Sequence, residues 1–160
     1  MSTAIIGFGA IGQALARAFA RKNIQVSVAA RRPLEAIAPL AKAIGPTVTA
    51  SSPADALKAQ IVILAIPYPE IAGLASTTNW SGKTVIDATN AIDFPDFTPT
   101  ELGGKFSSSI VQETLSGAKV VKAFNTIPAA ILAQSPEEDG GAVSCFCLEM
   151  TRTPARLPPP

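Results

Sequence analysis

The sequence predicts an α/β fold with a doubly wound, mostly parallel β-sheet, and three observations support this. Apolar runs typical of strands alternate with helical patterns along residues 3–132, as in βαβ units. The apolar run of residues 61–66 is continuous and rich in β-branched side chains, which is typical of a central parallel strand buried on both faces. The first run, residues 3–6, leads directly into a glycine-rich turn and then into a helical pattern over residues 13–21.

The turn after the first predicted strand has the pattern G-x-G-x-x-G. It consists of Gly7, Phe8, Gly9, Ala10, Ile11 and Gly12. Gly7 suits a tight turn, Gly9 lets a pyrophosphate approach the backbone, and Gly12 lets the helix pack closely on the strand. The helix N-terminus then offers unpaired N–H groups to phosphates. The turn therefore predicts dinucleotide binding in a Rossmann-type domain, and a glycine-rich turn without a ligand is the alternative.

The end of the second predicted strand, residues 25–30, indicates which dinucleotide is bound. NAD-binding domains carry an Asp or Glu near this point, which binds the ribose 2′-hydroxyl. Here Ala29 and Ala30 are followed by Arg31 and Arg32. Guanidinium groups can bind a 2′-phosphate bidentately. The pattern favours NADP(H), and Ser27 is a weaker candidate for this role. The alternative is a solvated pair of arginines at a strand end.

The next elements follow in βα order. Residues 33–44 predict a helix that Pro39 should kink or shorten. Residues 47–50 predict a strand, and Ser52 and Pro53 predict the N-cap and first position of a helix that runs to about residue 59. Pro67 ends the central strand of residues 61–66. Because ligands of open α/β sheets bind beyond the carboxyl ends of strands, this turn is a candidate cofactor contact, or else simply a rigid turn.

The second half continues the alternation. We expect a short helix over residues 71–77, a strand over 84–90, a helix over 107–115 capped near Ser107 or Ser108, a strand over 119–124 and a helix from 128 to 132. The irregular residues 92–105 suggest a lid or substrate rim. Asp87 lies in a buried strand, where it either caps neighbouring loop amides or helps to shape the site, and we favour the structural role. Asn90 follows it and can bond a nicotinamide amide or ribose.

Composition narrows the function classes. The chain has 160 residues, of which 48% are hydrophobic and 16% charged, with a net charge of +1. This suits one domain and gives no reason to expect nucleic acid or an anionic membrane as partner. Without a signal peptide or an apolar stretch of ~18 residues, a cytoplasmic location is expected. The chain has no His to pair with a nucleophile, and Cys145 and Cys147 are too close together for a zinc C-x-x-C pair.

Five blocks of the sequence together point to a family. They are Gly7–Gly12, Arg31-Arg32, Val62–Tyr68, Val85–Asn90 and Val121–Thr126. Across residues 3–132 the chain resembles the NADPH-dependent deazaflavin-coenzyme (8-hydroxy-5-deazaflavin) reductases. The cytoplasmic reductase domains of membrane metalloreductases share these blocks. Other members of the wider group are known only as NADP-binding reductases, so the resemblance leaves the acceptor open.

The resemblance implies an enzyme that transfers hydride directly between NADPH and a deazaflavin or flavin-like ring, a small-molecule redox acceptor. It places the nicotinamide near Ala65, Ile66 and Pro67. The residues that it places around the reaction centre are Asn90, Ala91 and Asn125. Ring-to-ring transfer depends on orientation and exclusion of water. We therefore expect no catalytic acid or base and no metal.

The tail departs from the family pattern. We expect residues 1–143 to form the NADP-binding Rossmann domain and residues 144–160, with Pro158–Pro160 at their end, to be an atypical, disordered tail that truncates the fold. The family continues here with another strand and helix. One hypothesis is that the tail is a frameshifted remnant of a longer protein, because codons for residues 147–158 can be chosen so that a one-base shift encodes a turn and a helix start. A native tail is the alternative. A missing helix would expose apolar sheet surface and favour a homodimer or aggregation.

Two other functions are compatible with the sequence. The first is a non-catalytic NADP(H)-binding module or truncated relic, which binds the dinucleotide without turnover. The second is the N-terminal half of a two-domain reductase acting on an imine or a 3-hydroxy acid. Such enzymes carry a large helical domain after the sheet, for which this chain has no room. We therefore disfavour the second.

Overall fold

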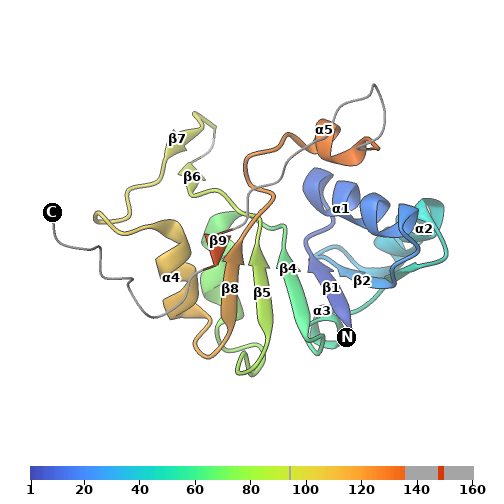
Figure 1. Ribbon diagram of the computed structural model, residues 1–160, viewed down its shortest axis with the longest axis horizontal. Helices are drawn as coiled ribbons and strands as arrows, with labels where there is room; N and C mark the ends of the chain where they lie inside the picture. Colours follow the sequence, from blue (N-terminus) through green and yellow to red (C-terminus); the bar gives the residue numbers. More distant parts are fainter. Residues whose placement is uncertain (94, 136–147, 150–160) are drawn as a thin grey trace, which may run out of the picture.

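A parallel β-sheet forms the centre of the protein (Figure 1). The computed structural model describes residues 1–93, 95–135 and 148–149. The parallel strands are β1 (Thr3–Ile6), β2 (Val26–Ala29), β3 (Val48–Ala50), β4 (Ile61–Leu64), β5 (Thr84–Asp87) and β8 (Lys119–Lys122). Their order, β3-β2-β1-β4-β5-β8, reverses direction between β1 and β4. This is the Rossmann order, so the predicted doubly wound fold is confirmed.

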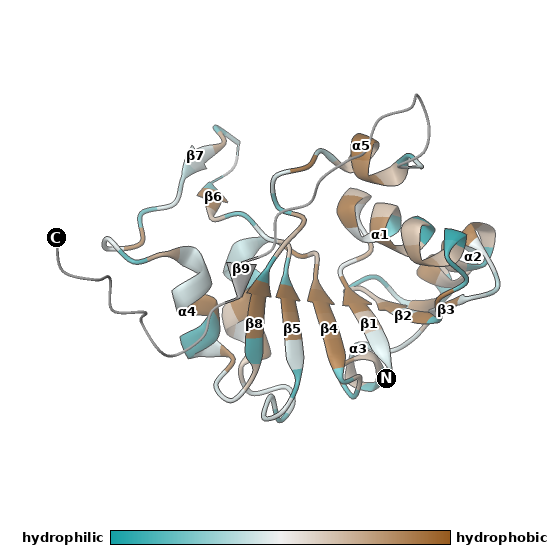
Figure 2. Cartoon of the chain, viewed as in Figure 1, coloured by the Kyte–Doolittle hydropathy of each residue, from teal (hydrophilic) through white to brown (hydrophobic). Residues whose placement is uncertain are grey.

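Helices cover both faces of the sheet. They are α1 (Ala10–Arg21), α2 (Leu34–Ile44), α3 (Pro53–Ala56), α4 (Ser107–Thr114), α5 (Ala129–Ala133) and the 3-10 helix η1 (Tyr68–Leu74). The core that includes side chains of α1 and α2 contains Ile5 and Ile63 of the sheet. The core that includes side chains of α3, η1 and α4 contains the neighbouring Val62 and Leu64. Alternate side chains of β4 thus enter opposite cores, which explains its continuous apolar run (Figure 2).

The strands end earlier than expected at their carboxyl ends. The strand predicted for residues 84–90 ends at Asp87 because the Asp87 carboxylate accepts a hydrogen bond from the Thr89 backbone N–H, at 2.9 Å. Such a side-chain turn removes the N–H from the ladder. The strand predicted for 119–124 ends at Lys122, and Phe124 adopts a left-handed φ of 64°. Likewise β2 and β4 end at Ala29 and Leu64, so the loops that follow are free to form a site.

Several helices also differ from their predicted bounds. Pro39 does not shorten α2, because it is exposed and its helix continues to Ile44; the carbonyl freed four residues earlier belongs to the exposed Glu35. Ser52 does cap α3, since its Oγ accepts from the Asp55 N–H at 3.1 Å. That helix nevertheless ends at Ala56, and 3-10 type turns continue to residue 59.

The segment predicted as a helix over residues 71–77 is instead η1, which begins at Tyr68 after Pro67. Pro69 fits its first turn, where the missing N–H costs nothing. Helix α4 is capped by Phe106 rather than by Ser107 or Ser108, because the Phe106 carbonyl accepts from the N–H groups of residues 109 and 110. The expected loop of residues 92–105 contains a small hairpin of β6 (Ile92–Asp93) and β7 (Thr98–Pro99).

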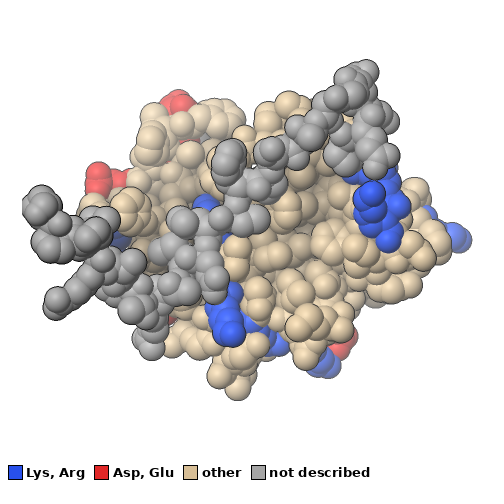
Figure 3. Space-filling view, viewed as in Figure 1, with Lys and Arg blue, Asp and Glu red and all other residues tan. Residues whose placement is uncertain are grey.

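The last described strand, β9 (Leu148–Glu149), pairs antiparallel with β8 at the edge of the sheet. These two residues belong to the segment that we expected to lie outside the domain. Cys145, Cys147, residues 140–143 and residues 150–160 lie outside the described residues, and the boundary at residue 143 stays a prediction. Within the part of the chain that the structure describes, no helix has the length and apolarity needed to span a membrane. Figure 3 shows a face on which uncharged side chains predominate.

Candidate functional site

The glycine turn connects β1 to α1 at the point where the strand order reverses. Gly7 has a φ of +100°, and a Cβ there would overlap the Ala65 carbonyl oxygen beyond β4. A Cβ on Gly12 would overlap the Gly7 carbonyl oxygen. These two glycines are therefore required for packing of the turn. A Cβ on Gly9, in contrast, would meet no atom within 4 Å, so the missing side chain of Gly9 leaves open space.

The N-terminus of α1 faces that open space. Gly9 is its N-cap, no side chain in the described part of the chain caps it, and no acidic residue lies in its first turn. The first helical bond is donated by the Gln13 N–H to the Gly9 carbonyl, at 2.9 Å. The preceding N–H groups of the helix and its positive dipole end thus remain available, which is the arrangement that binds phosphate groups.

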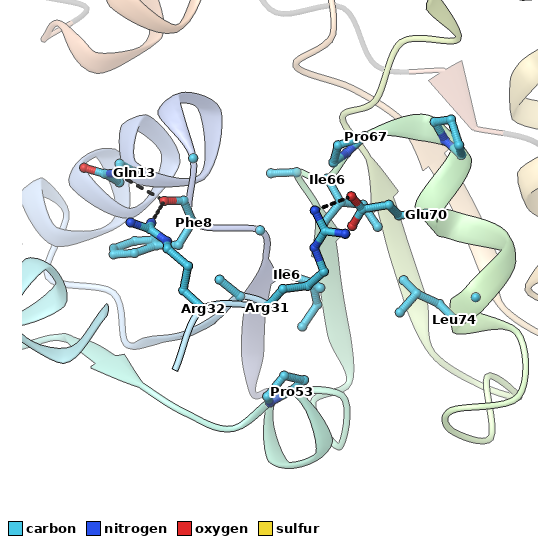
Figure 4. Close-up of a pocket in the computed structure, with 16 residues that line it drawn as sticks. Ile6, Phe8, Gln13, Arg31, Arg32, Pro53, Ile66, Pro67, Glu70 and Leu74 are labelled. Atoms are coloured by element: carbon cyan, nitrogen blue, oxygen red, sulfur yellow. Dashed lines mark hydrogen bonds and ion pairs between the residues drawn. The ribbon is translucent and has the colours of Figure 1, made fainter. Parts of the chain in front are cut away.

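A groove of about 920 Å³ begins at this turn (Figure 4). We call it the main groove. One wall consists of the glycine turn and the loop after β2, and the other consists of the loop after β4 and η1. Its lining residues are Ile6, Gly7, Phe8, Gly9, Gln13, Ala30, Arg31, Arg32, Pro53, Ala65, Ile66, Pro67, Pro69, Glu70, Gly73 and Leu74. The lining of the groove is mostly apolar, and its volume lies in the range of small-molecule binding sites.

Two arginines supply the positive charge of the main groove. The Arg32 guanidinium donates to the Phe8 backbone carbonyl at 2.9 Å, and the Gln13 amide donates to the same oxygen at 3.2 Å. The Arg32 bond ties the loop after β2 to the glycine turn, and the Gln13 bond ties α1 to it. The Arg31 guanidinium forms an ion pair with the Glu70 carboxylate at 3.1 Å. Sequence reasoning missed Glu70, although its place after β4 in a proline-rich turn at the carboxyl edge could have indicated it.

A second, smaller cavity lies at the carboxyl ends of β5 and β8. We call it the small crevice, and its volume is about 300 Å³. Its lining residues are Ile11, Ala88, Asn90, Phe124, Asn125, Thr126, Ile127, Pro128 and Ala129. Ile11 belongs to the glycine motif, two residues after Gly9, so both cavities adjoin the start of α1.

Two asparagines face each other in the small crevice. The Asn90 amide donates to the Asn125 backbone carbonyl at 2.9 Å, and the Asn125 amide donates to the Asn90 side-chain oxygen at 3.3 Å. The residues come from different strand ends, 35 positions apart in the chain. The pair holds two amide groups in a fixed relation, as a site that orients a polar ring requires.

A buried ion pair supports these loops from below. The Lys122 ammonium lies 2.9 Å from the Asp87 carboxylate and donates to the Thr89 carbonyl at 2.6 Å. The other Asp87 oxygen accepts from the Thr89 N–H and hydroxyl, at 2.9 and 2.7 Å. The structural role expected for Asp87 thus agrees with its contacts. Lys122 was missed, although it pairs in register with Asp87 across β5 and β8.

Tyr68 lies at the start of η1, beside the core. Its hydroxyl is buried and, among the described residues, has no hydrogen-bond partner. Burial raises the pKa of the Tyr68 phenol, and the nearby Asp87 carboxylate raises it further. Tyr68 is therefore neutral at physiological pH. Tyr68 is not among the described residues that line the main groove, whereas Pro67 and Pro69 on either side of it are.

The structure distributes the predicted site residues over the two cavities. Gly7, Phe8, Gly9, Arg31, Arg32, Ala65, Ile66 and Pro67 line the main groove. Ile11, Asn90 and Asn125 line the small crevice. Ala10, Gly12 and Ala91 line neither; the first two form the start of α1, and Ala91 follows Asn90.

The solved structures that are similar to this chain include two proteins that also resemble it in sequence. A hypothetical protein from Sinorhizobium meliloti is 46% identical, with a TM-score of 0.86 over 92% of this chain and 72% of that one. A protein from Arthrobacter sp. FB24, provisionally described as an F420-dependent NADP reductase, is 28% identical, with a TM-score of 0.75 over 95% of this chain and 74% of that one.

More distant structures share the fold alone. A reductive aminase from Aspergillus terreus is 18% identical, with a TM-score of 0.60 over 81% of this chain and 43% of that one. No curated protein matches the sequence. The family described as NADP oxidoreductase coenzyme F420-dependent matches residues 2–91. The chain therefore belongs to the NADP oxidoreductase coenzyme F420-dependent family and is an NADP-dependent oxidoreductase.

Proposed function

We propose that this NADP-dependent oxidoreductase transfers hydride directly between NADPH and a deazaflavin coenzyme or a flavin-like ring. In this proposal the adenosine and pyrophosphate of NADPH bind in the main groove, and the ring of the acceptor binds at the small crevice. The observation that carries the proposal is the position of the α1 N-terminus, which adjoins both cavities through Gly9 and Ile11.

The chemistry of the main groove fits a phosphorylated dinucleotide. Gly9 faces open space that a side chain would partly fill, and the uncapped helix N-terminus favours a pyrophosphate there. Arg31 and Arg32 line the groove at the end of β2, where a 2′-phosphate lies in NADP-binding domains. These features support NADP(H) rather than NAD(H), since β2 carries no acidic residue.

The small crevice fits a reaction without acid–base groups. None of the described residues that line it has an ionisable side chain, and the chain has no His. When bound, NADPH supplies the hydride from its nicotinamide; it is oxidised to NADP⁺ while the acceptor ring is reduced and takes up a proton from solvent. The protein's part is to orient and shield. Asn90 and Asn125 offer amides that orient the rings, and the apolar side chains Ile11 and Phe124 exclude water.

The family and the Arthrobacter protein support deazaflavin as acceptor, because both are named for dependence on F420. A non-catalytic module is less well supported, because the chain belongs to a family of oxidoreductases. Flavin-like rings are the second acceptor class, since the amides of Asn90 and Asn125 would orient either kind of ring.

The first experiment measures coenzyme binding. NADPH and NADH are titrated into the protein and followed by calorimetry or by the fluorescence of Trp80. Trp80 is the single tryptophan, and its indole N–H bonds to the carbonyl of Leu74 in the groove. We expect NADPH to bind at least ~10-fold more tightly, about 1.4 kcal/mol. Equal affinities, or a preference that survives Arg31→Ala with Arg32→Ala, would contradict the assignment of the groove.

The second experiment tests direct transfer. NADPH deuterated at the transferred position is mixed with deazaflavin coenzyme in ordinary water. We expect deuterium on the ring carbon of the reduced deazaflavin, because the hydride passes without exchange. Deazaflavin is the informative acceptor, since its reduced carbon does not exchange with water as a flavin nitrogen does. Reduced product without deuterium would rule out ring-to-ring transfer, and bound NADPH without turnover would favour the non-catalytic module.

A further inference from the structure

Glu70 is an acidic residue in a groove otherwise suited to phosphate. It lies in η1, on the wall of the main groove opposite the loop after β2, and its side chain is 25% exposed. Figure 4 shows Glu70 and Arg31 reaching toward one another from the two walls. Their contact of 3.1 Å joins one guanidinium nitrogen to one carboxylate oxygen. The ion pair therefore spans the groove.

Arg31 has other donors to offer. Its side chain is 84% exposed. A guanidinium carries five N–H groups, and the single contact to Glu70 leaves most of them for other acceptors. Arg32 differs from Arg31, because its guanidinium donates to the Phe8 backbone carbonyl. Of the two arginines at the end of β2, Arg31 is thus the one that faces a carboxylate.

A carboxylate at this place acts in opposite ways on the two coenzymes. A 2′-phosphate carries nearly two negative charges at neutral pH, and binding it at Arg31 brings it close to the carboxylate of Glu70, which repels it. A ribose 2′-hydroxyl carries no charge, and a carboxylate can accept a hydrogen bond from it. The loop after β2 lacks an acid, and Glu70 supplies one from across the groove.

We propose that Glu70 is a specificity-determining residue of the main groove: in the free protein it neutralises Arg31, and it lowers the preference for NADPH over NADH. This inference rests on the proposed binding of the coenzyme in the groove. The 2′-phosphate must compete with Glu70 for Arg31, whereas a 2′-hydroxyl does not. The coenzyme preference then reflects the balance between the two arginines and this one carboxylate.

The test compares Glu70→Gln with wild type. Calorimetry measures Kd for NADPH and NADH. It also measures Kd for adenosine 2′,5′-bisphosphate and AMP, which differ from each other only by the 2′-phosphate. We expect Glu70→Gln to tighten NADPH by up to about fivefold, the upper end of what exposed ion pairs contribute, with NADH unchanged or weaker. The affinity for adenosine 2′,5′-bisphosphate should rise as that for NADPH does, and the affinity for AMP should not change. Arg31→Ala should remove the gain when combined with Glu70→Gln.

Glu113→Gln is the matched control. Its carboxylate pairs with Lys105 at the same 3.1 Å, and neither residue lines the groove, so this variant should leave both affinities unchanged. If wild type prefers NADPH but Glu70→Gln leaves the ratio unchanged or lowers it, the role of Glu70 is refuted while the groove assignment stands. If wild type binds neither coenzyme, the proposed function and this inference fail together.

Discussion

The Lys122 ammonium and the Asp87 carboxylate form an ion pair across β5 and β8, with 2.9 Å between Nζ and Oδ2. The Asp87 side chain is fully buried and that of Lys122 is 13% exposed. The pair lies directly beneath the loops that carry Asn90 and Asn125. Its geometry therefore connects the stability of the sheet to the shape of the small crevice.

Removing Lys122 should strongly destabilise the protein. Lys122→Met leaves the Asp87 carboxylate buried without its cation, which costs about 3–5 kcal/mol. Urea unfolding followed by circular dichroism measures the free energy of unfolding. Lys105→Met is the control, because its pair with Glu113 is exposed and worth about 0–1 kcal/mol. Equal effects of the two variants would show that burial of the Lys122 pair does not matter.

Gly9 and Gly12 should respond differently to the same substitution. Gly9→Ala should fold normally, because its Cβ meets no atom within 4 Å, yet weaken NADPH by about tenfold or more by occupying the space of the pyrophosphate. Gly12→Ala should destabilise the fold by about 1–3 kcal/mol, because its Cβ overlaps the Gly7 carbonyl. Melting curves and NADPH titrations separate the two effects. Unchanged NADPH affinity in Gly9→Ala would contradict binding at this turn.

The asparagine pair should affect turnover more than coenzyme affinity. Asn90→Ala removes the donor to the Asn125 carbonyl and the acceptor of the Asn125 amide. We expect the rate of hydride transfer to deazaflavin to fall about tenfold or more through loss of orientation, with the Kd for NADPH little changed. Single-turnover kinetics measures the rate. Asn79→Ala, whose side chain bonds only to its own turn at Ser81 among the bonds described, should leave both quantities unchanged.

Tyr68 should titrate above the usual pKa of a tyrosine. It is the single tyrosine, so the ultraviolet absorbance of tyrosinate reports on it alone. Burial and the Asp87 carboxylate raise its pKa in the folded state, whereas the unfolded chain has a pKa of about 10. The raised pKa means that the neutral phenol contributes to the stability of the folded protein. This contribution is complete below pH ~10 and is lost as the pH rises through the pKa of the folded state. A midpoint equal to that in urea would show that the phenol is hydrated.

The sheet and the nucleotide motif were predictable because local patterns determine them. Strand β4 is apolar at every position because its successive side chains enter two different cores. Gly7 and Gly12 are required because a side chain at either position would overlap a backbone carbonyl in or beside the turn. Strand ends were less predictable. The end of β5 depends on the Asp87 side chain capturing the Thr89 N–H, a choice that periodicity does not reveal.

The least predictable contacts join residues distant in sequence. Arg31 and Glu70 meet only because β2 and β4 both flank β1. Asn90 and Asn125 meet because β8 lies beside β5. Each asparagine was a candidate on its own, but their mutual bonds follow from sheet order. Glu70 and Lys122 belong to no recognisable sequence motif. Their roles follow from Arg31 and Asp87, the partners that the fold places beside them.

The two cavities differ in how the chain encodes them. Among the described residues, all that line the main groove lie between Ile6 and Leu74, inside the 2–91 region shared with the family. The small crevice also needs residues 124–129, beyond that region. Genetic exchange of the segment after residue 91 would therefore replace much of one cavity and leave the other intact. If the main groove binds the coenzyme and the small crevice the acceptor, as proposed, such an exchange would change the acceptor while the coenzyme stayed the same.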